Sequence, residues 1–89
     1  MKRIHLIVSG VVQGVGFRYY TRKEALHLSL TGFVRNERDG SVQIEAQGTE
    51  EHLERFIQWA KRGPSNAQVE SIEQNEISSV NDEKDFSIR

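Results

Sequence analysis

Hydrophobic residues recur along this chain with two spacings, every second residue in some segments and every third or fourth in others. The first spacing, with its enrichment in β-branched residues, predicts strands at residues 3–9, 33–38, 42–47, 67–77 and 86–88. The second predicts helices at residues 17–28 and 50–62. The order βαββαβ, with a short extra strand at the end, predicts an α+β protein of the ferredoxin-like split βαβ type. Such a sandwich has an antiparallel sheet with two helices on one face.

Short-range signals locate several boundaries of these elements. Thr49 is a suitable N-cap for the second helix, and Gly63 followed by Pro64 is a stop signal after it. Asp39 and Gly40 predict a two-residue hairpin turn in which both residues have a positive φ. The strand at residues 67–77 departs from strict alternation, so we expect a β-bulge there.

Length and composition limit the classes of function. A chain of 89 residues supports one core, so we expect a single domain over residues 1–89. Twelve Lys and Arg against thirteen Asp and Glu give no basic excess, which argues against a nucleic-acid partner. The absence of cysteine excludes disulfides, thiolate metal sites and cysteine nucleophiles. No apolar run approaches the ~20 residues of a membrane span and no signal-peptide core is present, so we expect a cytoplasmic protein with no membrane partner.

The glycine-rich segment at residues 10–18 joins the first strand to the first helix. Gly14 and Gly16 allow successive N–H groups to point inward as an anion-binding nest, and the helix N-terminus adds its unpaired N–H groups. Arg18, in the first helical turn, offers a planar fork that matches two phosphate oxygens. From spacing alone, an ordinary strand–helix turn with a solvated Arg18 stays the alternative to this oxyanion cradle.

Three common phosphate-binding motifs are absent from this segment. A nucleotide P-loop requires a lysine after the last glycine, and none follows Gly16. A dinucleotide fingerprint requires a third glycine where Tyr19 stands, and a covalent phosphatase loop requires a cysteine where Val12 stands. The segment can therefore hold phosphate, but it offers no nucleophile to accept it.

Two separate signatures carry a resemblance to a known family. Residues 12–18 (Val-Gln-Gly-Val-Gly-Phe-Arg) and residues 32–42 resemble the acylphosphatase family. Further matches extend the resemblance over nearly the whole chain, at Gly48, Gly63-Pro64, Val69 and residues 85–88. The resemblance implies a ferredoxin-like sandwich that hydrolyses the carboxyl–phosphate anhydride of small-molecule acyl phosphates by direct water attack, without metal, cofactor or covalent intermediate. The sequence departs from the family pattern at Val11, where many relatives carry a basic residue. This departure lowers the positive electrostatic field expected at the loop.

The resemblance also assigns roles to individual residues. It implies that Arg18 and the main chain of the loop bind the phosphoryl group, and that Asn36 positions the attacking water. The loop residues so assigned are Gln13, Gly14, Val15, Gly16, Phe17 and Arg18.

Hydrolysis of an acyl phosphate also fits these residues when they are considered independently of the resemblance. An acyl phosphate releases a carboxylate whose acid has a pKa of about 4–5, so no general acid is needed. Asn36 lies within a predicted strand, where asparagine is disfavoured, although a turn or surface role is its alternative. Because we expect the second strand beside the first, the side-chain amide of Asn36 would reach the loop and orient a water molecule. An amide cannot accept the proton of that water.

Other polar residues and other functions are weaker candidates. His5, His27 and His52 lack metal-ligand spacing, and residues 82–85 predict a solvated loop. An RNA-binding sheet and a regulatory domain that keeps the anion site without turnover are the competing functions, because ferredoxin-like folds support both. Nothing in the sequence requires a dimer, so we expect a monomer.

Overall fold

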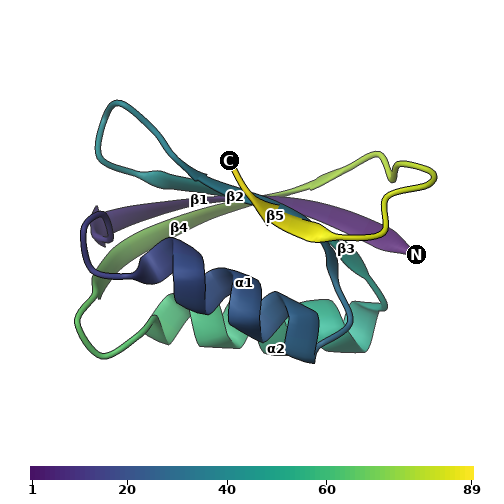
Figure 1. Ribbon diagram of the computed structural model, residues 1–89, viewed down its shortest axis with the longest axis horizontal. Coiled ribbons are helices and arrows are strands. Elements are labelled where there is room, and N and C mark those ends of the chain that lie inside the picture. The colour runs from purple at the N-terminus through teal and green to yellow at the C-terminus, as the bar shows by residue number, and fades with distance from the viewer.

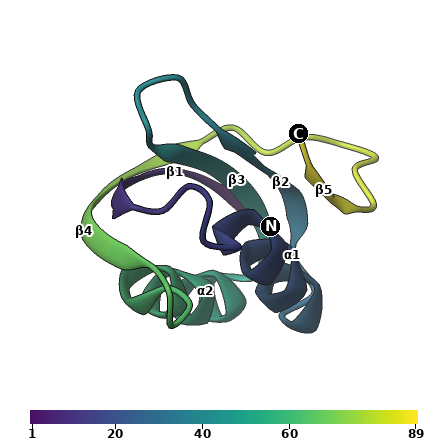
Figure 2. The ribbon, with the colours of Figure 1, turned by 60° about the vertical axis from the view of Figure 1, so that its left-hand side comes forward.

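The computed structural model describes residues 1–89, and its elements follow the predicted order (Figures 1 and 2). They are β1 (Lys2–Val11), α1 (Phe17–His27), β2 (Thr31–Asn36), β3 (Val42–Gly48), α2 (Glu50–Arg62), β4 (Gln68–Ile77) and β5 (Phe86–Ile88). Figure 1 shows both helices on one face of the sheet, so the predicted α+β, ferredoxin-like architecture is confirmed.

The strand order β4-β1-β3-β2-β5 corrects one expectation, because β2 does not lie beside β1. β3 pairs antiparallel with β1 on one side and with β2 on the other. The crossover through α1 makes β1 and β2 parallel and leaves a gap of one strand, which β3 fills when the chain returns through the hairpin. β4 pairs antiparallel with β1, whereas β5 adds a short parallel edge to β2.

The hairpin between β2 and β3 is wider than the predicted two-residue turn. Glu37 N–H donates to the Ser41 carbonyl at 2.9 Å and Gly40 N–H donates to the Glu37 carbonyl at 3.2 Å, so three residues, 38–40, form the loop. Of these only Gly40 has a positive φ, +93°. This is a tight turn closed by a glycine bulge, and the side chain of Asp39 supports it by accepting hydrogen bonds from the backbone and hydroxyl of Ser41.

The predicted bulge in β4 is confirmed at the end of β1 nearest the glycine-rich loop. Ser9 pairs with Ser71 and Gly10 with Val69, so Glu70 is the extra residue. Pairing continues to Val11, which extends β1 beyond the end expected at Gly10. β1 and β4 therefore stay paired past the bulge, up to the start of the loop.

The core lies between the sheet and the two helices. Alternate residues of β1 and β3 point to the helices, and they meet the apolar stripes of α1 and α2 in a cluster of 17 buried residues that includes Leu6, Ile44, Phe17 and Phe56. α2 has the ends predicted for it, since Thr49 Oγ1 accepts from His52 N–H at 3.3 Å and Gly63 terminates the helix. Neither helix is both long enough and apolar enough to cross a membrane.

A buried ion pair on the helix-free face was not predicted. Arg3 is only 3 % exposed and donates to Glu45 at 2.9 Å and to Glu83 at 2.8 Å. Glu83 belongs to the segment 78–85, which connects the two edge strands, and its side chain is 18 % exposed. The expectation that residues 82–85 form a fully solvated loop is therefore wrong at Glu83, because the buried guanidinium of Arg3 requires a charged partner.

This pair makes stability depend on pH. Burial raises the pKa of the Glu83 carboxyl, but the hydrogen bonds and charge of Arg3 outweigh it and hold the pKa below its ordinary value. The unfolded chain therefore binds the proton more readily, so the stabilisation is present above about pH 4.3, the unfolded pKa, and is lost as the pH falls through the folded pKa.

We expect Glu83→Gln to lower the free energy of unfolding at pH 7 by about 1–3 kcal/mol, because Arg3 stays buried and loses a charged partner. Chemical denaturation from pH 7 to pH 3 measures this, and the variant will lose less stability on acidification than the wild type. Glu73→Gln, at an exposed position on β4, is the control. An identical pH dependence in wild type and Glu83→Gln would contradict the assignment.

Candidate active site

The loop between β1 and α1 has the backbone geometry of an anion-binding nest. Gly14 and Gly16 have φ of +75° and +80°. This left-handed conformation would be strained for a residue with a side chain. Gly16 is also the N-cap of α1, and no side chain caps this helix. Left-handed residues that alternate with ordinary ones turn successive N–H groups to one side of the chain.

The amides at this helix end have no partners within the protein. The first main-chain hydrogen bond of α1 runs from Tyr20 N–H to the Gly16 carbonyl at 3.1 Å. The N–H groups of Phe17, Arg18 and Tyr19 come before it and have no acceptor within the helix. Residues 13–16 donate to no backbone carbonyl either. Unpaired N–H groups at the positive end of a helix form a favourable site for an oxyanion.

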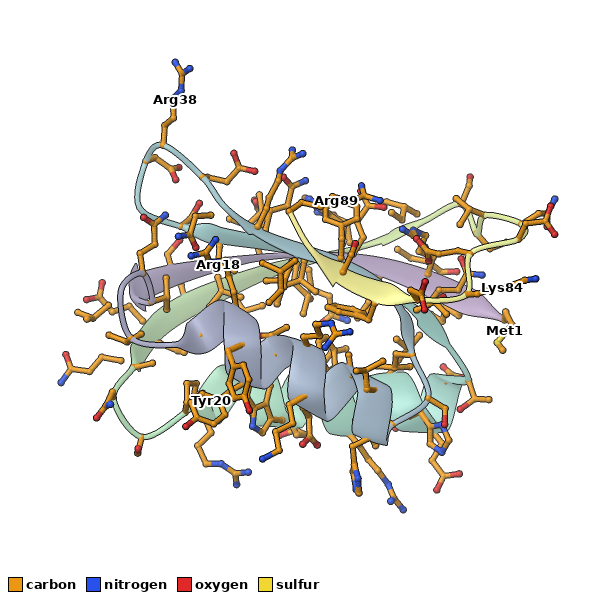
Figure 3. All side chains as sticks on the ribbon, viewed as in Figure 1. Met1, Arg18, Tyr20, Arg38, Lys84 and Arg89 are labelled. Atoms are coloured by element: carbon orange, nitrogen blue, oxygen red, sulfur yellow. The ribbon has the colours of Figure 1, made fainter.

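A hollow of about 230 Å³ opens at these amides. It brings together Arg18 at the start of α1 and Asn36 at the end of β2, two residues that the sequence analysis placed in one site. Figure 3 shows Arg18 directed from α1 toward the sheet, whereas Tyr20 points to the opposite side of the helix. The residues that line the hollow are Val12, Gly14, Gly16, Phe17, Arg18, Tyr19, Asn36 and Ile88.

The electrostatics of this hollow are positive. Arg18 is the only charged side chain that lines it, and no carboxylate does. Arg18 is exposed and forms no ion pair or hydrogen bond within the protein, so its guanidinium is available to a ligand. Elsewhere, no three histidine, aspartate or glutamate side chains gather closely enough to hold a metal ion.

Asn36 carries a buried oxygen without a partner. Its Oδ1 is shielded from bulk solvent and accepts no hydrogen bond from the protein. Buried polar atoms are nearly always paired, so an unpaired one beside a hollow indicates a place for a water molecule or a ligand. Although β3 lies between β1 and β2, the position of Asn36 at the last residue of β2 still brings it to the loop.

The other predicted loop residues contribute through the main chain. The side chain of Gln13 donates from Nε2 to the carbonyls of Glu37 at 2.7 Å and Ser41 at 2.9 Å, which ties the loop to the hairpin. Phe17 is buried in the core and Val15 packs against it. Only the N–H groups of these three residues are therefore free for a ligand.

Three residues of the hollow were not predicted as part of the site. Val12 is buried and supports the loop from the core side, while Tyr19 and Ile88 are exposed at the opening. Tyr19 follows Arg18 in the chain, so its position offered a weak signal. Ile88 lies 70 residues from Arg18 in sequence, and only the pairing of β5 with β2 reveals its place.

The aromatic surface expected of an RNA-binding sheet is not available on the helix-free face. Phe33 is buried, and the guanidinium of Arg89 lies 4.2 Å from its ring centroid. On the central strands β1 and β3 this face offers the imidazole of His5, which contacts Gln43 at 2.7 Å, and no Phe, Tyr or Trp ring for base stacking.

Comparisons with known proteins agree with this geometry. The sequence profile of the family described as Acylphosphatase matches residues 4–88. An acylphosphatase from Mannheimia succiniciproducens is 42 % identical over 99 % of this chain and 98 % of its own length, and one from Geobacillus thermodenitrificans is 48 % identical over 99 % and 94 %. The crystal structure of acylphosphatase from Bacillus subtilis superposes with a TM-score of 0.95 at 40 % identity, covering 100 % of this chain and 99 % of that one.

The fold and these comparisons together define a ferredoxin-like α+β hydrolase. The chain belongs to the acylphosphatase family and hydrolyses the carboxyl–phosphate anhydride of acyl phosphates.

The tie between Gln13 and the hairpin predicts a positioning effect. Gln13→Ala removes two hydrogen bonds that hold the loop, so its amides lose their fixed arrangement and bind an oxyanion less well. We expect the dissociation constant for inorganic phosphate to rise about tenfold and KM to rise more than kcat falls, measured by calorimetry and steady-state kinetics.

Gln58→Ala, at an exposed position on α2, is the control and will leave both quantities unchanged. Phosphate affinity equal to wild type in Gln13→Ala would show that the tie does not position the loop.

Proposed function

We propose that the loop amides and Arg18 bind the phosphoryl group of the substrate, and that Asn36 orients a water molecule for direct attack on phosphorus. The observation that carries this proposal is the unpaired, buried Asn36 Oδ1 in the same hollow as the unpaired amides of α1. A water that donates to this oxygen would lie beside a phosphoryl group held by the loop. The domain over residues 1–89 would then contain the whole site.

The reaction balances without a covalent enzyme intermediate. The water oxygen bonds to phosphorus, the bond from phosphorus to the acyl oxygen breaks, and the carboxylate leaves with the bonding electrons. Phosphoryl transfer through a loose transition state mainly requires positioning and charge stabilisation, which the amides and Arg18 supply. Asn36 cannot accept a proton, so the proton of the water passes to the phosphate itself.

The leaving group explains why this site suffices. The carboxylate product is the base of an acid with a pKa of about 4–5 and leaves without protonation, whereas a phosphate ester would expel an alkoxide. We therefore infer activity on small-molecule acyl phosphates without a metal ion, with esters as poor substrates. A monomeric, cytoplasmic enzyme without nucleic-acid or membrane partners stays part of this proposal.

Arg18→Ala will test the phosphoryl-binding role. We expect kcat/KM for acetyl phosphate, measured with a chelator present, to fall by about 10²–10³, as when an oxyanion donor is removed. Arg18→Lys keeps the charge but loses the planar fork, so it will recover only part of the activity. Lys23→Ala, on the exposed side of α1, is the control, and wild-type turnover in Arg18→Ala would overturn the assignment.

Asn36→Ala will test the orientation of water. We expect kcat to fall by about 10- to 100-fold with little change in KM, because the amide acts on the water rather than on the bound ground state. Phosphate affinity will stay close to wild type for the same reason. Asn75→Ala, at an exposed position on β4, is the matched control. A rise in KM without loss of kcat would instead place Asn36 among the substrate-binding groups.

A further inference from the structure

The lining of the hollow has a polar part and an exposed apolar part. We call the loop main chain, Arg18 and Asn36 the floor and the exposed side chains of Tyr19 from α1 and Ile88 from β5 the rim, while the buried side chains of Val12 and Phe17 back the hollow from the core. The two rim side chains are 60 % and 44 % exposed, respectively. Large apolar groups exposed beside a polar site can bury surface against a ligand that continues outward from the floor.

The ring of Tyr19 is held by its neighbour. It packs edge-on against Tyr20, with ring centroids 5.1 Å apart and an interplanar angle of 81°. This arrangement is favourable for two aromatic rings and restricts the rotamers of both. Binding a ligand against Tyr19 therefore costs less side-chain entropy than binding against a free ring.

The main chain at Ile88 is fixed by the sheet. It pairs with Val34 of β2, and the N–H of Arg89 donates to the Val34 carbonyl at 2.8 Å. Arg22, one helical turn after Arg18, donates from Nε to the Phe86 carbonyl at 2.8 Å and fastens β5 to α1. These bonds fix the main chain of β5 against β2 and α1, so the position of Ile88 relative to the start of α1 is set by the fold.

The charges of the site also favour an apolar group at the rim. Arg18 is the only charged side chain of the hollow, and the phosphoryl group neutralises it. A charged acyl group would meet the ring of Tyr19 and the aliphatic side chain of Ile88 without a charged partner, whereas an apolar one would cover both.

We propose that Tyr19 and Ile88 bind the acyl part of the substrate and select acyl phosphates whose acyl group is aromatic or branched and apolar. This selection rests on the proposed function, because the phosphoryl group must occupy the floor for the acyl group to meet the rim. An acetyl group is too small to cover either side chain fully, so it gains little from them.

Kinetics on two substrates test the rim. For the wild type, Tyr19→Ser and Ile88→Ser, kcat/KM is measured with benzoyl phosphate and with acetyl phosphate, and the ratio of the two values is compared. The two substrates differ in intrinsic reactivity, but this difference is the same for every variant and cancels when the ratios are compared. We expect the ratio of benzoyl phosphate to acetyl phosphate to fall about three- to tenfold in each rim variant. Leu26→Ser, at a residue 46 % exposed on α1 but outside the hollow, is the control and will keep the wild-type ratio. An unchanged ratio in both rim variants would overturn the proposal.

A binding measurement separates this inference from the proposed chemistry. Phenylphosphonate and methylphosphonate are not hydrolysed, and we expect calorimetry to show tighter binding of phenylphosphonate to the wild type, with the difference reduced in Tyr19→Ser and Ile88→Ser. Equal affinity for the two phosphonates in the wild type would refute the rim, even if acetyl phosphate is turned over. A preference for phenylphosphonate that is reduced in the rim variants would support binding of the acyl group by Tyr19 and Ile88, even if the protein hydrolysed neither acyl phosphate.

Discussion

The unpaired main-chain amides at the start of α1 are the constraint on which the site depends. α1 has no side-chain cap, and left-handed glycines at 14 and 16 turn the preceding N–H groups to the same side. α2 differs at its N-terminus, because the Thr49 side chain caps it by accepting from the N–H of His52. A helix end left open in this way requires an anion or solvent. Arg18 is the one charged side chain in the hollow beside it, and we propose that it completes an oxyanion site there.

The rest of the fold keeps this end of α1 in place. The bulge at Glu70 lets β1 and β4 stay paired up to the loop, and Gln13 anchors the loop to the β2–β3 hairpin. Insertion of β3 between β1 and β2 places the last residue of β2, Asn36, at the hollow. The buried pair of Arg3 and Glu83 stabilises the helix-free face through the segment that leads to β5.

Sequence reasoning succeeded where the signal was local. The stripe of α2, its cap at Thr49 and its end at Gly63 are encoded within one segment. The left-handed glycines of the loop and the place of Arg18 in the first turn of α1 are local in the same way, while their role in binding phosphate stays a prediction. It was wrong about the length of the hairpin, which is a local feature closed by hydrogen bonds within residues 37–41. It was also wrong about the neighbours of β1 and the exposure of Glu83, which are set by contacts between distant segments. Arg3 and Glu83 lie 80 residues apart, and nothing near either one shows that the chain will bury them together.

The role of the amides can be observed without turnover. Titration of ¹⁵N-labelled protein with inorganic phosphate, followed by ¹H–¹⁵N correlation spectra, reports each N–H group separately. We expect saturable shifts that are largest for the amides of residues 14–19 and that are weakened strongly in Arg18→Ala. Phosphate binding with unperturbed amides in this segment, or with the largest shifts elsewhere in the chain, would contradict an oxyanion site at the N-terminus of α1.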